Sequence, residues 1–170
     1  MGIAFRACPS AITEKRRHGE PPARFALRLA REKAAQVAGQ FPGRIVLGAD
    51  TIVVYRDTIY GKPRTAAAAR RILRRLSGTT HTVYTAVAVI DTAAPRILVD
   101  IDAAIVRTRK LSARHIHHLA EKNLDKAGGY AVQEDQDILV KKIDGNYDTV
   151  VGLPRTIVAN LLRCCGWPGT

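Results

Sequence analysis

The fold class of this chain is indicated first by one segment, Arg44-Ile45-Val46-Leu47-Gly48-Ala49-Asp50-Thr51-Ile52-Val53-Val54-Tyr55. Its two ends, 44–47 and 51–55, are rich in β-branched and apolar residues, which predicts a buried strand that leads into a hairpin. Between these runs, Gly48 and Ala49 place little side-chain bulk before Asp50. We therefore expect the Asp50 carboxylate at a strand end, where sites are common in α/β folds.

The rest of the chain alternates irregularly between helical and extended patterns. Apolar spacing together with Pro, Ser and Gly boundaries predicts helices over 22–38, 65–76, 111–122 and 156–164. Long β-branched runs predict an antiparallel pair of strands at 81–91 and 96–107, and shorter runs predict strands at 58–60, 130–132 and 138–143. The pattern favours an α/β fold with a mixed, largely antiparallel central sheet and flanking helices.

Composition limits the class of protein further. With 170 residues and 46% hydrophobic residues, the chain is expected to form one domain with a real core. No apolar run is long enough to cross a bilayer, and Cys8, Cys164 and Cys165 show neither a disulfide framework nor zinc spacing. We therefore expect a cytoplasmic protein without a membrane partner. The net charge of +12 indicates a polyanionic partner: nucleic acid, anionic lipid or a phosphate-rich small molecule.

Single residues leave alternatives open. Asp50 could bind a divalent metal or accept a proton from an attacking water, but an Asp that caps a turn is the commoner case. The loop Tyr60-Gly61-Lys62-Pro63 is stiff enough to hold Lys62 against a phosphate, although most loop lysines are solvated. Lys33 lies on the apolar face of its helix and needs a partner or a route to solvent. Glu14 and Glu20 flank a basic patch that reads as a solvated charge cluster.

Several segments along the chain form one ordered set of motifs: Arg28-Leu29-Ala30-Arg31-Glu32-Lys33-Ala34, Leu47-Gly48-Ala49-Asp50-Thr51-Ile52-Val53-Val54, Gly61-Lys62-Pro63, Leu76-Ser77-Gly78 with Thr80-His81 and Tyr84-Thr85, Asp125-Lys126-Ala127-Gly128, and Val150-Val151-Gly152-Leu153-Pro154. In their order and spacing, from near residue 2 to residue 164, these segments resemble the Maf family of nucleoside triphosphate pyrophosphatases.

The resemblance implies an active-site cleft, a divalent cation (Mg²⁺ or Mn²⁺), and hydrolysis between the α- and β-phosphates that gives a nucleoside monophosphate and pyrophosphate. Asp50 matches the family's catalytic proton acceptor. Glu14, Lys33 and Lys62 match its other polar site residues, and Asp50 and Glu14 are the expected metal ligands. Such a set suits a substrate with about four negative charges and a metal ion.

Two positions that resemble the family's dTTP/UTP branch bear on the substrate. Thr51 follows the catalytic Asp and Gln133 lies in the late Gly-Tyr segment, whereas the branch that prefers 7-methyl-GTP usually carries Gln and Glu there. An amide both donates and accepts hydrogen bonds toward a pyrimidine edge, while a carboxylate only accepts. The resemblance thus implies dTTP and UTP as substrates, with modified pyrimidine nucleotides as further candidates, in a housecleaning role. Glu134, where the family commonly has Gly, is expected to alter selectivity.

The start of the chain departs from the family pattern. Members begin with a strand and a Ser-x-Ser-Pro-Arg-Arg loop that contributes phosphate contacts, whereas this chain opens at Met1-Gly2-Ile3, just after that loop. We therefore expect a single Maf-like domain over residues 1–170 that is truncated at its N-terminus. The alternative function is a catalytically weakened paralogue that binds nucleotide or nucleic acid. The family also implies a homodimer.

Overall fold

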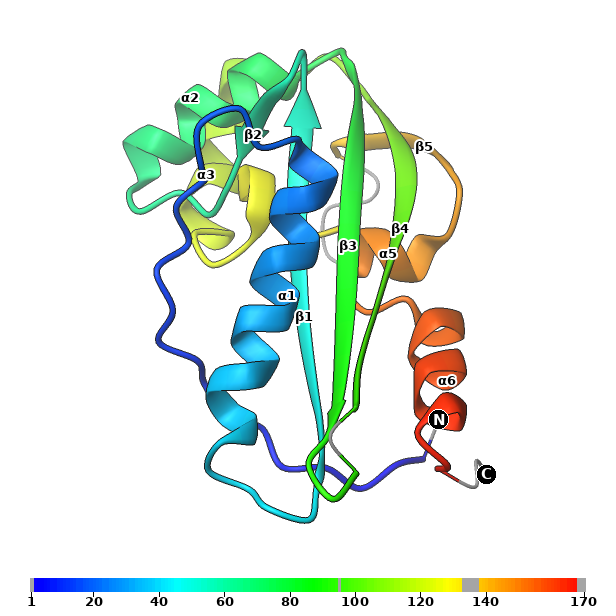
Figure 1. The fold of residues 1–170 in the computed structure, drawn as a ribbon. Coiled ribbons are helices and arrows are strands. Elements are labelled where there is room, and N and C mark those ends of the chain that lie inside the picture. Colours follow the sequence, from blue (N-terminus) through cyan, green and yellow to red (C-terminus); the bar gives the residue numbers. More distant parts are fainter. Residues whose placement is uncertain (1, 95, 133–137, 168–170) are drawn as a thin grey trace. The chain divides into compact units, whose positions relative to one another are not determined.

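A computed structural model of the chain describes residues 2–94, 96–132 and 138–167. Its centre is a five-stranded antiparallel sheet in the order β2-β1-β3-β4-β5, flanked by helices (Figure 1). The strands are β1 (Ile45–Tyr55), β2 (Thr58–Tyr60), β3 (Thr80–Asp91), β4 (Arg96–Thr108) and β5 (Val140–Asp144). The helices are α1 (Pro22–Ala38), α2 (Ala66–Leu76), α3 (Ala113–Lys122), the 3₁₀ turn η1 (Ala127–Gly129), α5 (Tyr147–Val151) and α6 (Arg155–Cys164). The α/β fold with a largely antiparallel sheet is confirmed.

Two sequence-based expectations about strands are wrong. Asp50 does not end a strand, because β1 continues without interruption through Gly48 and Ala49 to Tyr55. No strand forms at 130–132; instead Gly128 and Gly129, at φ of 73° and 71°, turn the chain in the left-handed region just before Tyr130. Glycine adopts that region without the Cβ clash that other residues suffer, so the backbone leaves the extended path there.

The chain divides into two compact units, each described here by itself. The first consists of Met1–Asp50, Thr85–Asp102 and Gly152–Thr170, and the second of Thr51–Tyr84 and Ala103–Val151. Strands β1, β3 and β4 contribute residues to both. The assignment of one Maf-like domain stays a prediction.

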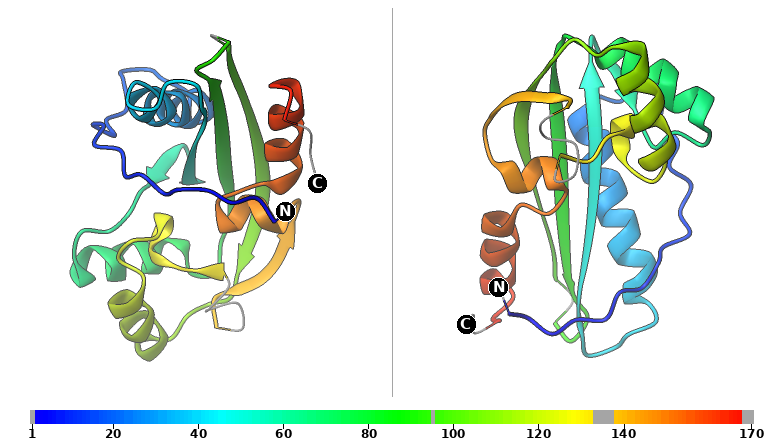
Figure 2. Two further views of the ribbon diagram at one scale, coloured as in Figure 1. Left: turned by 90° about the horizontal axis from the view of Figure 1, so that it is seen from below. Right: turned by 180° about the vertical axis from the view of Figure 1, so that it is seen from behind.

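In the first unit, helices cover both faces of the sheet (Figure 2). Helix α1 packs on one face, where Gly48 lies so close that a Cβ there would come 2.6 Å from the carbonyl oxygen of Ala30. Helix α6 packs on the other face through a cluster of Val158, Leu161 and Leu162 with Val87 and Val89. Since successive strand residues point to opposite faces, β1 directs Val46, Gly48 and Asp50 toward α1.

In the second unit, α2 and α3 pack against each other over a larger apolar core. Leu73 and Leu76 of α2 and Ile116 and Leu119 of α3 are buried in it. Both helices begin at a hydroxyl cap, since Thr65 accepts a hydrogen bond from the backbone of Ala68 and Ser112 from that of His115. The start of α3 two residues after the predicted position follows from the Ser112 cap.

No helix in the described parts of the chain combines the length and the apolar character that crossing a membrane requires.

Candidate active site

Asp50 lies in the middle of β1 and is only 6% exposed. A buried carboxylate is costly unless it is paired, because low-dielectric surroundings do not solvate its charge. The partner is Lys33 of α1, whose Nζ lies 2.5 Å from Oδ1 of Asp50. The close approach of α1 over Gly48 brings this lysine to the strand. The sequence left open whether Lys33 has an ionic partner or only a route to solvent, and the structure shows that Asp50 is its partner.

Glu14 completes a chain of three charges in the first unit. Its Oε1 lies 2.6 Å from Nζ of Lys33, so one ammonium donates to two carboxylates. Exposure rises along the series, from 6% for the Asp50 side chain and 17% for Lys33 to 45% for Glu14. The three side chains thus form a connected series of ion pairs that begins at the buried face of β1 and ends at the protein surface. The structure thus brings together three of the four residues that the sequence assigns to catalysis.

The environment of Lys33 has opposing effects on its pKa. Burial by itself lowers the pKa, since it disfavours the charged amine, but the hydrogen bonds that Lys33 donates to Asp50 and Glu14 outweigh burial and raise the pKa above its ordinary value. The ammonium is therefore charged at every physiological pH. A permanent positive charge beside Asp50 stabilises the ionised carboxylate, which is the form able to accept a proton.

The donor atoms of this cluster fit a hard divalent cation. Glu14 and Asp50 offer carboxylate oxygens, the ligand type that Mg²⁺ and Mn²⁺ prefer, and Lys33 donates to one oxygen of each. The described residues contain no group of three or more His, Cys, Asp or Glu side chains suited to a metal. Two carboxylates agree with the usual manner of Mg²⁺ binding, in which one or two protein carboxylates act together with substrate phosphates.

Lys62 belongs to the second unit, where its loop packs against another matching segment. The backbone N–H of Gly128 donates to the carbonyl of Gly61 at 3.2 Å, and a Cβ at Gly129 would lie 3.5 Å from Pro63. A hydrogen bond from Lys126 lowers the pKa of Asp125, and the charge of Lys62 contributes in the same direction. The motifs 61–63 and 125–128 are thus neighbours, and Lys62 itself is exposed.

Of the two expected specificity residues, the structure describes only Thr51. Thr51 follows Asp50 in β1 and is partly buried, and the alternation of the strand directs its side chain away from the face that carries Asp50. Gln133, like Glu134, lies outside the described residues. The roles of Thr51 and Gln133 in choosing the base stay predictions.

The sequence interpretation missed two arrangements. Glu20, assigned to a solvated charge cluster, receives a bidentate pair of hydrogen bonds from Arg28 at 2.7 and 2.8 Å. His81 and Tyr130 form a buried pair, with 2.8 Å between Nε2 and the phenolic oxygen. Arg28, His81 and the Gly-Tyr segment all occurred among the family-like stretches, so the signal was present. Contacts over eight and forty-nine residues cannot be read from local patterns.

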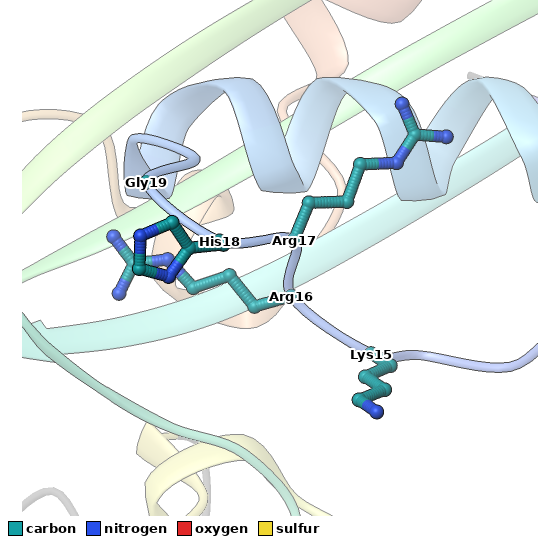
Figure 3. Close-up of a pocket in the computed structure, with 5 residues that line it drawn as sticks. All are labelled: Lys15, Arg16, Arg17, His18 and Gly19. Carbon is teal, nitrogen blue, oxygen red and sulfur yellow. The ribbon is translucent and has the colours of Figure 1, made fainter.

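Next to the charge cluster, the residues Lys15, Arg16, Arg17, His18 and Gly19 line a pocket (Figure 3). The residues of this pocket follow Glu14 directly in the chain, so basic groups come next to the outermost carboxylate of the cluster. The arrangement as a whole suits a substrate that carries both a metal ion and several phosphate charges.

Comparison with known proteins identifies the family of this chain. Residues 1–165 match the family model of the Maf-like proteins. A dTTP/UTP pyrophosphatase of Geobacter sulfurreducens is 42% identical over 167 residues, which cover 97% of this chain and 87% of that protein. Proteins of the same name from Anaeromyxobacter dehalogenans strain 2CP-1 and Syntrophus aciditrophicus are 42% and 37% identical, over 99% and 98% of this chain and 87% and 82% of their own lengths. The chain belongs to the family of Maf-like proteins.

Proposed function

We propose that this protein is a nucleoside triphosphate pyrophosphatase that hydrolyses dTTP and UTP to the monophosphate and pyrophosphate. The observation that carries the proposal is the buried Asp50, paired with Lys33 and through it with Glu14, in a chain 42% identical to enzymes named for this activity. A buried, charged and positioned carboxylate is what a general base requires.

In the proposed reaction, the Asp50 carboxylate takes a proton from a water molecule whose oxygen attacks the α-phosphorus. The bond from the α-phosphorus to the oxygen that bridges it to the β-phosphate breaks, and the electron pair leaves with pyrophosphate. Lys33 holds Asp50 in position and in its ionised form. Asp50 and Glu14 would hold a Mg²⁺ or Mn²⁺ ion, which supplies charge neutralisation at the phosphates when bound. Lys62 is the further phosphate-binding group of this proposal.

The test is pyrophosphate release from dTTP, UTP and 7-methyl-GTP with Mg²⁺ or Mn²⁺, compared between the wild-type protein and the Asp50→Asn variant. General-base catalysis is typically worth about 10²–10⁴-fold, so Asp50→Asn should lower kcat by at least about 100-fold. Asp100→Asn is the matched control, because Asp100 is an exposed Asp on the sheet, and it should leave kcat unchanged. Release of no pyrophosphate from any of the three by the wild-type protein would refute the proposal.

The preference for pyrimidine nucleotides rests on Thr51 and Gln133. We expect Gln133→Glu to lower kcat/KM for dTTP while kcat/KM for 7-methyl-GTP falls less or rises, because a carboxylate cannot donate a hydrogen bond to the base. Equal losses with both nucleotides would assign Gln133 no part in the choice of base.

The cellular setting belongs to the same proposal. Cys8, Cys164 and Cys165 are free thiols, which supports a reducing compartment such as the cytoplasm and the removal of unwanted pyrimidine nucleotides there. We also propose a homodimer, on the family resemblance alone. Sedimentation equilibrium over a range of protein concentrations tests it, and a monomer mass throughout would exclude it.

A further inference from the structure

The residues Lys15-Arg16-Arg17-His18-Gly19, called the basic turn below, line one pocket of the first unit (Figure 3). The segment has three formal positive charges and a histidine but no acidic residue. The four side chains of the segment are exposed. A pocket of this composition, open to solvent, suits a small polyanion better than an apolar ligand.

The basic turn is held in shape from within. The Glu20 carboxylate accepts a hydrogen bond from the backbone N–H of Arg17 at 3.1 Å, and the carbonyl of Glu20 accepts one from Nε of Arg16 at 2.6 Å. On the opposite side, Nη2 of Arg28 donates to the carbonyl of Lys15 at 3.0 Å. Gly19 closes the turn at a φ of 69°. These contacts pre-organise the backbone before any ligand arrives.

The charges that hold the turn do not titrate near neutral pH. The hydrogen bond from Arg28 lowers the pKa of Glu20 to about 2, and the same pair raises the pKa of Arg28. Arg28 also binds Glu32 on the next turn of α1, at 3.1 Å. Glu20 and Glu32 are therefore engaged with Arg28, and Glu14 is engaged with Lys33, so each of these carboxylates already has a cationic partner outside the turn.

The side chains of the turn differ in how far they are already engaged. Lys15 and His18 make no side-chain hydrogen bond or ion pair with any described residue. Arg17 lies 3.6 Å from Glu32 and remains 69% exposed, a weak contact that water and salt compete with. Arg16 uses Nε for the carbonyl of Glu20. Lys15 and Arg17 are thus the cationic side chains of the turn most available to bind an anionic ligand.

The basic turn begins directly after Glu14, the outermost member of the Glu14–Lys33–Asp50 cluster. We propose that the turn binds the β- and γ-phosphates of the substrate, the half that leaves as pyrophosphate. The inference rests on the proposed function for the identity of that substrate. The ligand chemistry by itself is that of a short inorganic polyphosphate, which charge-assisted hydrogen bonds from ammonium and guanidinium groups recognise without any base or sugar.

The experiment measures binding of inorganic tripolyphosphate by titration calorimetry, and separately the steady-state kinetics with dTTP. The test variant is Lys15→Gln with Arg17→Gln, which removes two charges from the turn but leaves the backbone contacts of Glu20 and Arg28. The matched control is Arg71→Gln with Arg75→Gln, which removes the same charge from an exposed face of α2 in the second unit. Thermal unfolding verifies that both variants are folded.

The test variant should raise the Kd for tripolyphosphate about tenfold or more and lower kcat/KM for dTTP by a similar factor, because the turn contacts the pyrophosphate that carries the leaving charge. The control should change neither the Kd nor kcat/KM by more than about twofold, because it removes the same charge from an exposed, salt-screened helix face and leaves the turn intact. An unaltered Kd in the test variant, an equal rise in the control, or no tripolyphosphate binding by the wild-type protein would overturn the inference.

The two proposals fail in distinguishable ways. If the wild-type protein binds tripolyphosphate through the turn but releases no pyrophosphate from dTTP, the proposed function is wrong and the anion site stands. If the wild-type protein hydrolyses dTTP but the test variant binds tripolyphosphate as tightly as the wild type, the proposed function is supported and the proposed anion site is wrong. A single-stranded DNA oligonucleotide serves as a third ligand, and weaker binding of DNA alone in the test variant would reassign the turn to nucleic acid.

Discussion

Gly48 permits the contact between β1 and α1 on which the candidate active site depends. A Cβ at this position would lie 2.6 Å from the carbonyl oxygen of Ala30 and 2.7 Å from the backbone nitrogen of Ala34. Both atoms belong to helix backbone, so neither can move aside without shifting α1. Because Lys33 lies between these two residues, a displaced helix also displaces the partner of Asp50.

We therefore predict that Gly48→Ala lowers the free energy of unfolding by about 1–3 kcal/mol, the usual cost of overpacking. Urea denaturation measures it. Gly39→Ala is the control, since a Cβ there meets only the carbonyl oxygen of Gln36 at 4.0 Å and φ is an ordinary −59°. Equal stability of Gly48→Ala and the control would mean that the contact between β1 and α1 is looser than described.

Lys33 and Asp50 form a buried pair whose members depend on each other. Lys33→Met leaves the Asp50 charge buried beside Glu14 without its ammonium, and should cost about 3 kcal/mol of stability at pH 7. Adding Asp50→Asn removes the stranded charge, so the double variant should be more stable than Lys33→Met alone. Urea denaturation of the four proteins of this cycle tests the coupling.

The contrast for that cycle is the exposed pair of Lys126 with Asp125. Lys126→Met should cost less than about 1 kcal/mol, because exposed ion pairs are screened by water. If Lys33→Met costs no more than Lys126→Met, or if the double variant gains nothing over Lys33→Met, the Lys33–Asp50 pair is not coupled as proposed.

At the scale of elements, a buried histidine joins β3 to the segment that follows η1. His81 is 2% exposed, its Nε2 is bonded to the Tyr130 hydroxyl, and its Nδ1 has no hydrogen-bond partner among the described residues. Burial lowers the pKa of His81 to about 4 and raises that of Tyr130. The imidazole is therefore neutral in the folded protein at neutral pH.

This pairing predicts a loss of stability in mild acid. Between pH 6.5 and 4 the unfolded chain protonates His81 while the folded protein does not, so the unfolded state binds more protons and stability falls as the pH falls. The loss attributable to His81 should approach about 3 kcal/mol near pH 4, from a shift of roughly 2.5 pH units. His81→Gln should flatten the dependence on pH in that window, as followed by urea denaturation at several pH values.

The exposed His118 provides the matched control, because His118→Gln should keep the wild-type slope between pH 4 and 6.5. A wild-type slope in His81→Gln would place the acid sensitivity elsewhere in the protein.

At the scale of the whole molecule, the net charge of +12 is compensated unevenly. Around α1, Arg28 and Lys33 each bind two carboxylates. Helix α2, by contrast, carries Arg70, Arg71, Arg74 and Arg75 without an acidic residue. Neighbours four positions apart on a helix lie on the same face, so like charges there repel each other. The prediction of a solvated basic face on this helix agrees with the exposure of Arg71, Arg74 and Arg75.

We predict that Arg71→Gln with Arg75→Gln stabilises the protein slightly at low ionic strength, by about 0.2–0.5 kcal/mol. For a chain of this size the melting temperature should rise by about 1 °C. At about 1 M salt, where the Debye length is about 3 Å, the difference should vanish. Scanning calorimetry at both salt concentrations measures the effect, and a difference that persists at high salt would have a cause other than repulsion.

The elements that the sequence predicted correctly depend on local signals. Helix α1 was predicted with the bounds 22–38 because its apolar spacing, its Pro-Pro start and Gly39 all lie within one stretch of chain. The long strands β3 and β4 follow from β-branched runs of a dozen residues. The predicted strand at 130–132 did not form, because Tyr130 is extended but Val132 is helical, and burial of this short segment in the core overrode the strand propensity of Tyr and Val.

By itself, the sequence determined the α/β class, most of the helices and strands, the positive charge, and the family whose motifs single out Asp50, Lys33, Glu14 and Lys62. The position of Asp50 within a continuous strand became clear only from the packed structure. Gly48 does not form a turn; its missing Cβ lets α1 approach β1, and this approach joins Lys33 to Asp50, seventeen residues further along the chain. The pairing of Glu20 with Arg28, which shapes the basic turn, was decided in the same way. Charges become buried, paired and specific only when distant segments pack, so local patterns identify the residues while packing determines their partners.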